Sequence, residues 1–185
     1  MPFENRKPHM RKLNFNQSMI DEAVKKAKNL GSINNSITSG GGNLAGYLAE
    51  IALAEDLQCN NVSCDEGDDK YNYDLIKNDL KIDVKTKRRT VDPESSYEVS
   101  IAETSKHQKA DTYAFVSITF KGKRGKGRSA TYHGVESIWL CGFMPKKEYF
   151  EKAKFWERGD VDSSNGFRVH ANMYNMPISS LKESE

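Results

Sequence analysis

The sequence predicts a single α/β domain built on a central mixed sheet that helices flank. Three observations carry this prediction: an almost wholly apolar helical segment at 43–57, a charged hairpin at 71–87, and a run rich in β-branched and aromatic residues at 112–120. Shorter segments between them complete the order helix, strand, strand, strand, helix, strand. The chain has 185 residues, which is enough for one such domain with a proper core.

Composition limits the classes of protein to consider. Charged residues make up 29% of the chain, but the formal net charge is only +2, so affinity for a polyanion must come from local clusters. Three irregularly spaced cysteines do not make a secreted disulfide framework and suit a reducing compartment. No segment approaches the roughly 20 apolar residues of a membrane span. We therefore expect a cytoplasmic protein of a prokaryotic or virus-infected cell, with no membrane partner.

The first part of the chain is predicted to be a basic arm followed by a scaffold helix. Residues 1–15 are rich in Lys and Arg and can lie along phosphates, although a solvated terminus explains them as well. The domain itself is expected to span 16–181. The segment Asn16-Gln17-Ser18 can start a first helix that runs to about Leu30 and buries one apolar stripe.

The helical segment 43–57 is apolar on nearly all sides, yet Glu50 lies in its middle. A buried carboxylate without a partner costs several kcal/mol or takes up a proton. Glu50 is therefore expected to meet a cation, a hydrogen-bond donor or a metal-bound water. An ordinary core glutamate held by a lysine or by the backbone remains an alternative, and Glu55 is a weaker candidate for the same role.

The hairpin is predicted from strands at 71–76 and 80–87 joined by the two-residue turn Asn78-Asp79. Counting back from this turn places Asp74 directly opposite Asp83. Opposed residues have Cβ atoms roughly 4.5–5.5 Å apart, and like charges there are destabilising. A hard cation such as Mg²⁺ would compensate the repulsion, because it prefers carboxylate oxygens. A solvated, charged hairpin is the alternative.

Alternation along the second strand separates its side chains into two faces. Lys81, Asp83, Lys85 and Lys87 are expected on one face of the sheet, whereas the residues between them, which are mostly apolar, face the other side. The strand is thus ionic on one side and suited to a core on the other.

Asp74, followed by Asp83-Val84-Lys85, resembles the acidic-x(n)-(Asp/Glu)-x-Lys signature of the PD-(D/E)xK, or restriction-endonuclease-like, nuclease superfamily. Tyr73 stands where the family often has proline. The resemblance implies a restriction-endonuclease-like αβββαβ core over 43–120. It also implies that Glu50, on the helix that precedes the hairpin, completes an acidic cluster.

The resemblance further implies a Mg²⁺-dependent endonuclease that hydrolyses phosphodiester bonds of DNA, with Mn²⁺ able to substitute. Asp74, Asp83 and the Val84 carbonyl would hold the metal, and Glu50 would bind it through water or recruit a second ion. Lys85 would orient the attacking water or stabilise the phosphorane. Whether one or two metals take part stays open.

Basic residues after the hairpin are expected to contact nucleic acid. The segments that follow read as a strand at 97–102, a short helix at 103–109, the central strand, and a cationic loop at 121–128 between two strands. The loop at 121–128 could also serve solubility alone. The resemblance to the nuclease superfamily implies that the short helix at 103–109 faces the active site. The predicted contacts are Lys87, Arg88, Arg89, Lys106, Gln108, Lys121, Lys123, Arg124, Lys126 and Arg128.

The C-terminal part is expected to complete the domain. A strand at 131–143 and a helix at 145–156 precede a tail whose apolar residues, including Phe167, pack back on the core.

Several functions remain open at this stage. Among nucleases, an exonuclease or a junction resolvase competes with the endonuclease, and a small single domain suits a homodimer acting on branched DNA. From another class, a noncatalytic DNA- or RNA-binding protein could keep the fold and the basic surface. A metabolic enzyme has no support, because the chain lacks a nucleotide fingerprint, and no nucleotide cofactor is expected.

Overall fold

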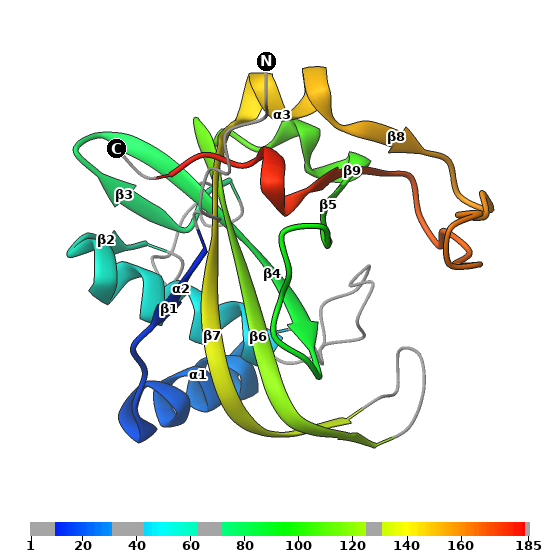
Figure 1. Cartoon of the computed structure of the whole chain (residues 1–185). Coiled ribbons are helices and arrows are strands. Elements are labelled where there is room, and N and C mark those ends of the chain that lie inside the picture. The colour runs from blue at the N-terminus through cyan, green and yellow to red at the C-terminus, as the bar shows by residue number, and fades with distance from the viewer. Residues whose placement is uncertain (1–9, 31–42, 63–71, 125–130, 184–185) are drawn as a thin grey trace, which may run out of the picture.

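The computed structural model describes residues 10–30, 43–62, 72–124 and 131–183. The fold is mixed α/β, as predicted (Figure 1). Its helices are α1 (Gln17–Leu30), α2 (Asn43–Leu57) and α3 (Lys146–Lys152), with 3-10 turns η1 (Glu103–His107) and η3 (Ile178–Ser180). Its strands are β1 (Arg11–Leu13), β2 (Asn60–Asn61), β3 (Leu75–Lys77), β4 (Leu80–Arg89), β5 (Glu98–Ala102), β6 (Thr112–Arg124), β7 (Thr131–Pro145), β8 (Lys154–Trp156) and β9 (Met173–Pro177). None of the described helices is both long and apolar enough to cross a membrane.

Within the described residues, the main sheet has six strands in the order β1-β7-β6-β4-β3-β2. The sheet is mixed because β4 runs parallel to β6, whereas every other pair of neighbouring strands in it is antiparallel. The long β6–β7 pair curls across the molecule in Figure 1. Two register shifts, at Phe115/Val116 and Thr119/Phe120, interrupt this pair, and such bulges increase local bend and twist.

Two hydrophobic cores lie on opposite faces of this sheet. The first, which includes Ile82 and Val84, packs the sheet against α1 and α2. The second is formed around Tyr113, Phe115 and Tyr149, where α3 and a small sheet of order β5-β9-β8 cover the other face. Figure 1 shows the helices α1 and α2 on one side of the main sheet and the small sheet on the other. Alternation along β4 therefore sends apolar residues toward the helices and ionic residues toward the small sheet.

The strand at 98–102 departs from the predicted arrangement. It was expected as the third strand of the central sheet, but β5 leaves that sheet and pairs with β9, with Val99 opposite Met176. Val99 and Ile101 are buried in the second core, so this pairing covers apolar surface that the main sheet exposes on its second face. The helix expected at 103–109 is only the 3-10 turn η1.

Three further expectations need correction. Arg11–Leu13 is a strand at the sheet edge rather than part of a loose arm, because Leu13 is buried and the Arg11 guanidinium pairs with Asp56. The helix expected at 145–156 ends at Lys152, and the next residues form β8 against β9. Phe167 does not join the core, since it is 50% exposed.

Other local predictions are confirmed. The helix α2 has the predicted bounds, and the Asn16 side chain accepts a hydrogen bond of 3.0 Å from the Met19 amide at the start of α1. The central strand β6 contains the predicted segment and continues beyond it to Arg124.

Candidate functional site

The hairpin β3–β4 has the register that the sequence predicted. Lys77 lies opposite Leu80, and both turn residues have positive φ, 49° for Asn78 and 65° for Asp79. Such a two-residue turn matches the twist of the strands it joins. Beyond the last paired residue of β3, the Asp74 amide donates a hydrogen bond of 2.8 Å to the Ile82 carbonyl. The ladder thus brings Asp74 beside Asp83.

Asp74 lies at the centre of the acidic residues. Its Oδ2 accepts a hydrogen bond of 2.7 Å from the Val84 amide, which fixes the carboxylate against β4. Desolvation raises the pKa of Asp74 well above its ordinary value, and the charges of Glu50 and Asp83 raise it further. The Val84 amide and Lys85 act in the opposite direction. The helix α2 and the hairpin therefore bring the Glu50 and Asp83 carboxylates within electrostatic reach of Asp74.

Asp83 is almost completely buried, with 4% of its surface exposed, and it is held by two partners. The Lys85 amine lies 2.6 Å from Asp83 Oδ2, and the Gln108 amide donates a bond of 3.3 Å to Oδ1. Lys85 also donates a bond of 2.9 Å to the Gln108 side-chain oxygen. The three side chains thus form a closed triangle next to the Asp74 carboxylate.

Two residues that the sequence did not single out support Lys85. Its amine lies 3.5 Å from the Ser105 hydroxyl and 5.6 Å from the centre of the Tyr113 ring. Burial and the Asp83 charge raise the pKa of the Tyr113 hydroxyl, so this ring stays neutral. The pattern of the central strand predicted that Tyr113 lies in the core. No sequence signal linked Ser105 or Tyr113 to the site.

Glu50 is 8% exposed and projects from the middle of α2, a helix whose other residues are mostly buried or half-buried. Its charge is the second largest cause of the raised Asp74 pKa. Glu50 and Asp83 thus each lie close enough to Asp74 for their charges to raise its pKa.

The metal site expected from the resemblance stays a prediction. Across residues 10–30, 43–62, 72–124 and 131–183, no group of three or more His, Cys, Asp or Glu side chains is arranged to hold a metal ion. Instead, the Lys85 amine contacts one of the candidate ligands, Asp83. In this structure the Lys85 amine thus lies at Oδ2, on one side of the Asp83 carboxylate.

The expected contacts of the short helix are only partly brought to the site. Gln108 lies in it, whereas the Lys106 amine donates a bond of 2.7 Å to the Tyr174 hydroxyl and lies over the Phe150 and Tyr174 rings. Lys106 therefore belongs to the aromatic layer beside β9. A role for Lys106 at the active site, which the resemblance offers as a possibility, stays a prediction.

The other predicted basic contacts are spread along β4 and β6. Lys87 and Arg89 share the face of β4 that carries Lys85, and both reach the β5 backbone. Arg88 lies between them and is half-buried, and Lys121 is exposed on β6. The side chains of Lys123, Arg124, Lys126 and Arg128 lie outside the described residues.

No protein-family model, no curated protein and no solved structure matches this chain.

Proposed function

We propose that this chain is a metal-dependent deoxyribonuclease, and more specifically an endonuclease that hydrolyses phosphodiester bonds. The observation that carries the proposal is the electrostatic coupling of Asp74 to Glu50 and Asp83, with the Lys85 amine 2.6 Å from Asp83. Like charges gathered in a desolvated place are costly, and such arrangements are more frequent at functional sites than elsewhere.

The order of elements supports the proposal. The segment α2-β2-β3-β4-η1-β6 has the order helix, strand, strand, strand, helical turn, strand, and β4 is parallel to β6. In this assignment β2, which precedes the hairpin, counts as the first of the three strands, the hairpin supplies the second and third, and the strand at 98–102 is left out. This order is compatible with the αβββαβ core that the PD-(D/E)xK resemblance implies.

The charges of the cluster fit a divalent cation. Three carboxylates face one ammonium group, which leaves an excess of two negative charges when all are ionised. Asp74, Asp83 and the Val84 carbonyl would hold the ion, with Glu50 in reach of a bound water. Mg²⁺, or Mn²⁺ in its place, would supply an activated water and neutralise the scissile phosphate.

The remaining work falls to Lys85 and Gln108. Gln108 accepts a hydrogen bond from the Lys85 amine while it donates one to Asp83, so it fixes the direction in which the ammonium group points. A fixed ammonium group beside the phosphate can stabilise the negative charge that develops on it, and preorganised charge contributes most of such rate enhancements.

Cleavage of supercoiled plasmid and of branched DNA tests the proposal. We expect the wild-type chain to cleave with Mg²⁺ and the variants Asp83→Ala and Lys85→Ala to lose at least a hundredfold in rate while remaining folded. Lys147→Ala is the matched control, because Lys147 is 90% exposed on α3 and far along the chain from the site. Wild-type rates in either site variant would refute the assignment.

A panel of substrates separates the kinds of nuclease. Linear, closed circular, nicked and four-way DNA are compared with RNA of the same sequence. Cleavage of closed circles indicates an endonuclease, resistance of circles indicates an exonuclease, and preference for the four-way substrate indicates a junction resolvase.

The Asp83–Lys85 ion pair favours a second candidate, a noncatalytic nucleic-acid-binding protein that keeps this geometry without a metal. Titration calorimetry distinguishes the two candidates. A nuclease should release or take up heat with Mn²⁺ that disappears in Asp74→Ala, whereas a binder without a metal site should show none.

A further inference from the structure

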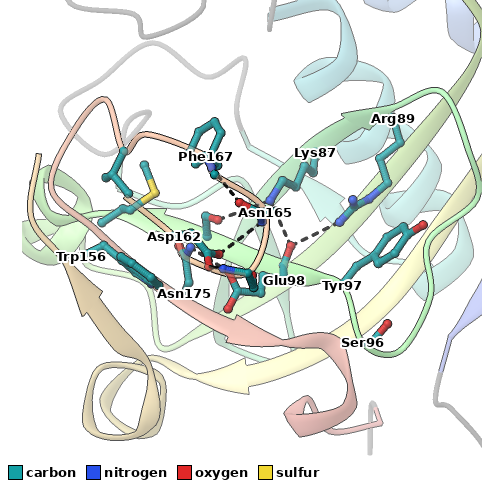
Figure 2. Close-up of a pocket in the computed structure, with 15 residues that line it drawn as sticks. Lys87, Arg89, Ser96, Tyr97, Glu98, Trp156, Asp162, Asn165, Phe167 and Asn175 are labelled. Atoms are coloured by element: carbon teal, nitrogen blue, oxygen red, sulfur yellow. Dashed lines mark hydrogen bonds between the residues drawn. The ribbon is translucent and has the colours of Figure 1, made fainter. Parts of the chain in front are cut away.

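A large pocket lies between the end of β4 and the small sheet (Figure 2). It measures about 870 Å³, which is within the range of roughly 300–1,000 Å³ typical of ligand sites. Strands β4, β5, β8 and β9 and the loop that follows β8 contribute its walls. The pocket starts at Lys87, two residues along β4 from Lys85, so it lies about 7 Å from the candidate site at a strand rise of 3.3 Å per residue.

One wall of the pocket carries two positioned cations. The Lys87 amine donates a bond of 3.0 Å to the Glu98 carbonyl and lies 3.5 Å from the Ser100 hydroxyl. The Arg89 guanidinium donates bonds to the Ser117 hydroxyl and the Glu98 carbonyl, at 3.1 and 3.2 Å, and lies 4.9 Å from the Tyr97 ring centre. These contacts hold both side chains in place before any ligand arrives.

The electrostatics of this wall favour an anion. Desolvation and, to a smaller extent, the neighbouring positive charge of Arg89 lower the pKa of Lys87 to about 8, although the charge of Glu98 opposes the shift. Desolvation also lowers the pKa of Arg89. A phosphate between the two side chains would relieve both the desolvation and the repulsion.

The opposite end of the pocket is aromatic and rich in hydrogen-bonding groups. Figure 2 shows Trp156 and Asp162 there, away from Arg89 and Tyr97. The Lys154 amine lies 3.6 Å from the centre of the Trp156 ring and covers one face of it. Phe167, which is 50% exposed, also lines this end. Aromatic rings beside acceptors match the flat face and the polar edge of a nucleobase.

Two residues of the lining also carry a buried polar atom that lacks a partner among the described residues. Trp156 Nε1 and Asn175 Oδ1 have less than 1 Å² exposed, and within the described part of the chain neither has a hydrogen-bond partner. One is a donor and the other an acceptor. Buried polar groups without a partner are costly and call for an explanation.

We propose that this pocket holds one nucleotide of the bound strand, with its phosphate between Lys87 and Arg89 and its base against Trp156. This inference rests on the proposed function, because the nucleotide in the pocket would lie one or two nucleotides along the strand from the phosphate that is cleaved beside Asp83. A base in the pocket is unstacked from its neighbours. The chain should therefore bind a single strand or a frayed end more tightly than a fully paired duplex.

Tryptophan fluorescence without metal tests this inference. In a Trp139→Phe background, Trp156 is the remaining tryptophan, since the chain has two. Oligothymidylates of one, two, four and eight nucleotides and a blunt duplex are titrated in EDTA. We expect quenching by the single strands, with an affinity that rises with length from one to four nucleotides and that falls at least tenfold for the duplex.

Variants locate the site by the anisotropy of a labelled single-stranded octanucleotide. We expect Trp156→Ala to weaken binding between about fivefold and a hundredfold, as for the loss of one base-stacking contact, and Arg89→Ala to weaken it comparably. Phe155→Leu, which changes the residue beside Trp156, and Lys147→Ala, which removes a charge elsewhere, should leave the affinity unchanged. This readout uses the native tryptophans, so it stands even if Trp139→Phe does not fold.

The results separate this inference from the nuclease proposal. Metal-dependent cleavage that Asp83→Ala abolishes, together with no quenching by any oligonucleotide, would overturn the pocket assignment alone. Quenching without cleavage by the wild-type chain would overturn the nuclease and leave strand binding in the pocket. Equal affinity for the mononucleotide and the octanucleotide would overturn the assignment to a strand.

Discussion

Replacing Asp74 by asparagine should stabilise the metal-free protein while it abolishes cleavage. The Asp74 carboxylate is desolvated beside the charges of Glu50 and Asp83, and its Oδ2 accepts a hydrogen bond from the Val84 amide. Asparagine keeps an oxygen for that amide and removes the charge. The substitution therefore isolates the repulsion from the hydrogen bond.

The expected magnitude follows from the hairpin geometry. The Cβ atoms of directly opposed residues lie about 5 Å apart, and two unit charges at that separation repel by ~3 kcal/mol at an effective dielectric constant near 20. Lys85 offsets part of this repulsion. We expect Asp74→Asn to raise the free energy of unfolding at pH 7 by about 1–3 kcal/mol. Asp74→Ala should be less stable than the asparagine variant by about 1–3 kcal/mol, because the Val84 amide then lacks its acceptor.

The gain should depend on pH in a defined direction. Because the pKa of Asp74 is raised in the folded state, this group favours folding below its unfolded pKa of about 4, and that contribution is lost as the pH rises through the folded pKa. The asparagine variant lacks this dependence. The difference between variant and wild type should thus be largest at neutral pH and shrink toward pH 4.

Urea unfolding in EDTA at several pH values between 4 and 8 measures this difference. Glu55→Gln is a matched control, since Glu55 is an exposed carboxylate near the end of α2. An asparagine variant that is no more stable than wild type at pH 7, or a gain that is the same at pH 4, would refute the reasoning.

Three further predictions follow from the same geometry. Gln108→Ala should reduce the cleavage rate about tenfold with little loss of stability, because Lys85 loses its orienting partner. Lys106→Ala should leave the rate unchanged. Plasmid nicking assays measure the rates, and thermal melting measures the stabilities. The affinity for single strands should fall as the pH rises from 7 to 9, because Lys87, with a pKa of about 8, loses its charge. The Lys87→Arg variant should keep its affinity over this range. Anisotropy titrations at constant ionic strength measure both, and an equal fall in wild type and variant would contradict the idea. Leu13→Ala should cost about 2–4 kcal/mol in urea unfolding, since this side chain is buried at the sheet edge, and a cost below about 0.5 kcal/mol would mean that the segment is a loose arm after all.

The hairpin and its acidic pair could be predicted because their determinants are local. The two-residue turn at Asn78 fixes the register, and a period of two then decides which side chains of the strand share a face. The apolar helix around Glu50 could be predicted for the same reason, since its pattern is contained in one segment.

The second sheet could not be predicted, because its pairing is nonlocal. β5 joins β9 some seventy residues later in the chain, with Ile101 opposite Tyr174, and the periodicity of either strand is equally consistent with the main sheet. The pocket depends on that pairing and on β8, which the sequence suggested to be helical. Lys87 and Arg89 were therefore expected to contact nucleic acid, but the walls around them were not foreseen.

The sequence also could not show which of Lys106 and Gln108 contacts Asp83 and Lys85. An α-helix places side chains at about 100° intervals, whereas η1 is a 3-10 turn with about three residues per turn. Gln108 follows the turn in an extended conformation, with φ −59° and ψ 145°, which directs its amide toward Asp83.

The most direct measurement is the rate at which the purified wild-type chain cleaves closed circular DNA with Mg²⁺ and with EDTA. The arrangement of Asp74, Asp83 and Lys85 predicts nicked and linear products that appear with Mg²⁺ or Mn²⁺ and stop on chelation. Intact circles under every metal condition, from protein whose folding is verified by circular dichroism, would contradict it.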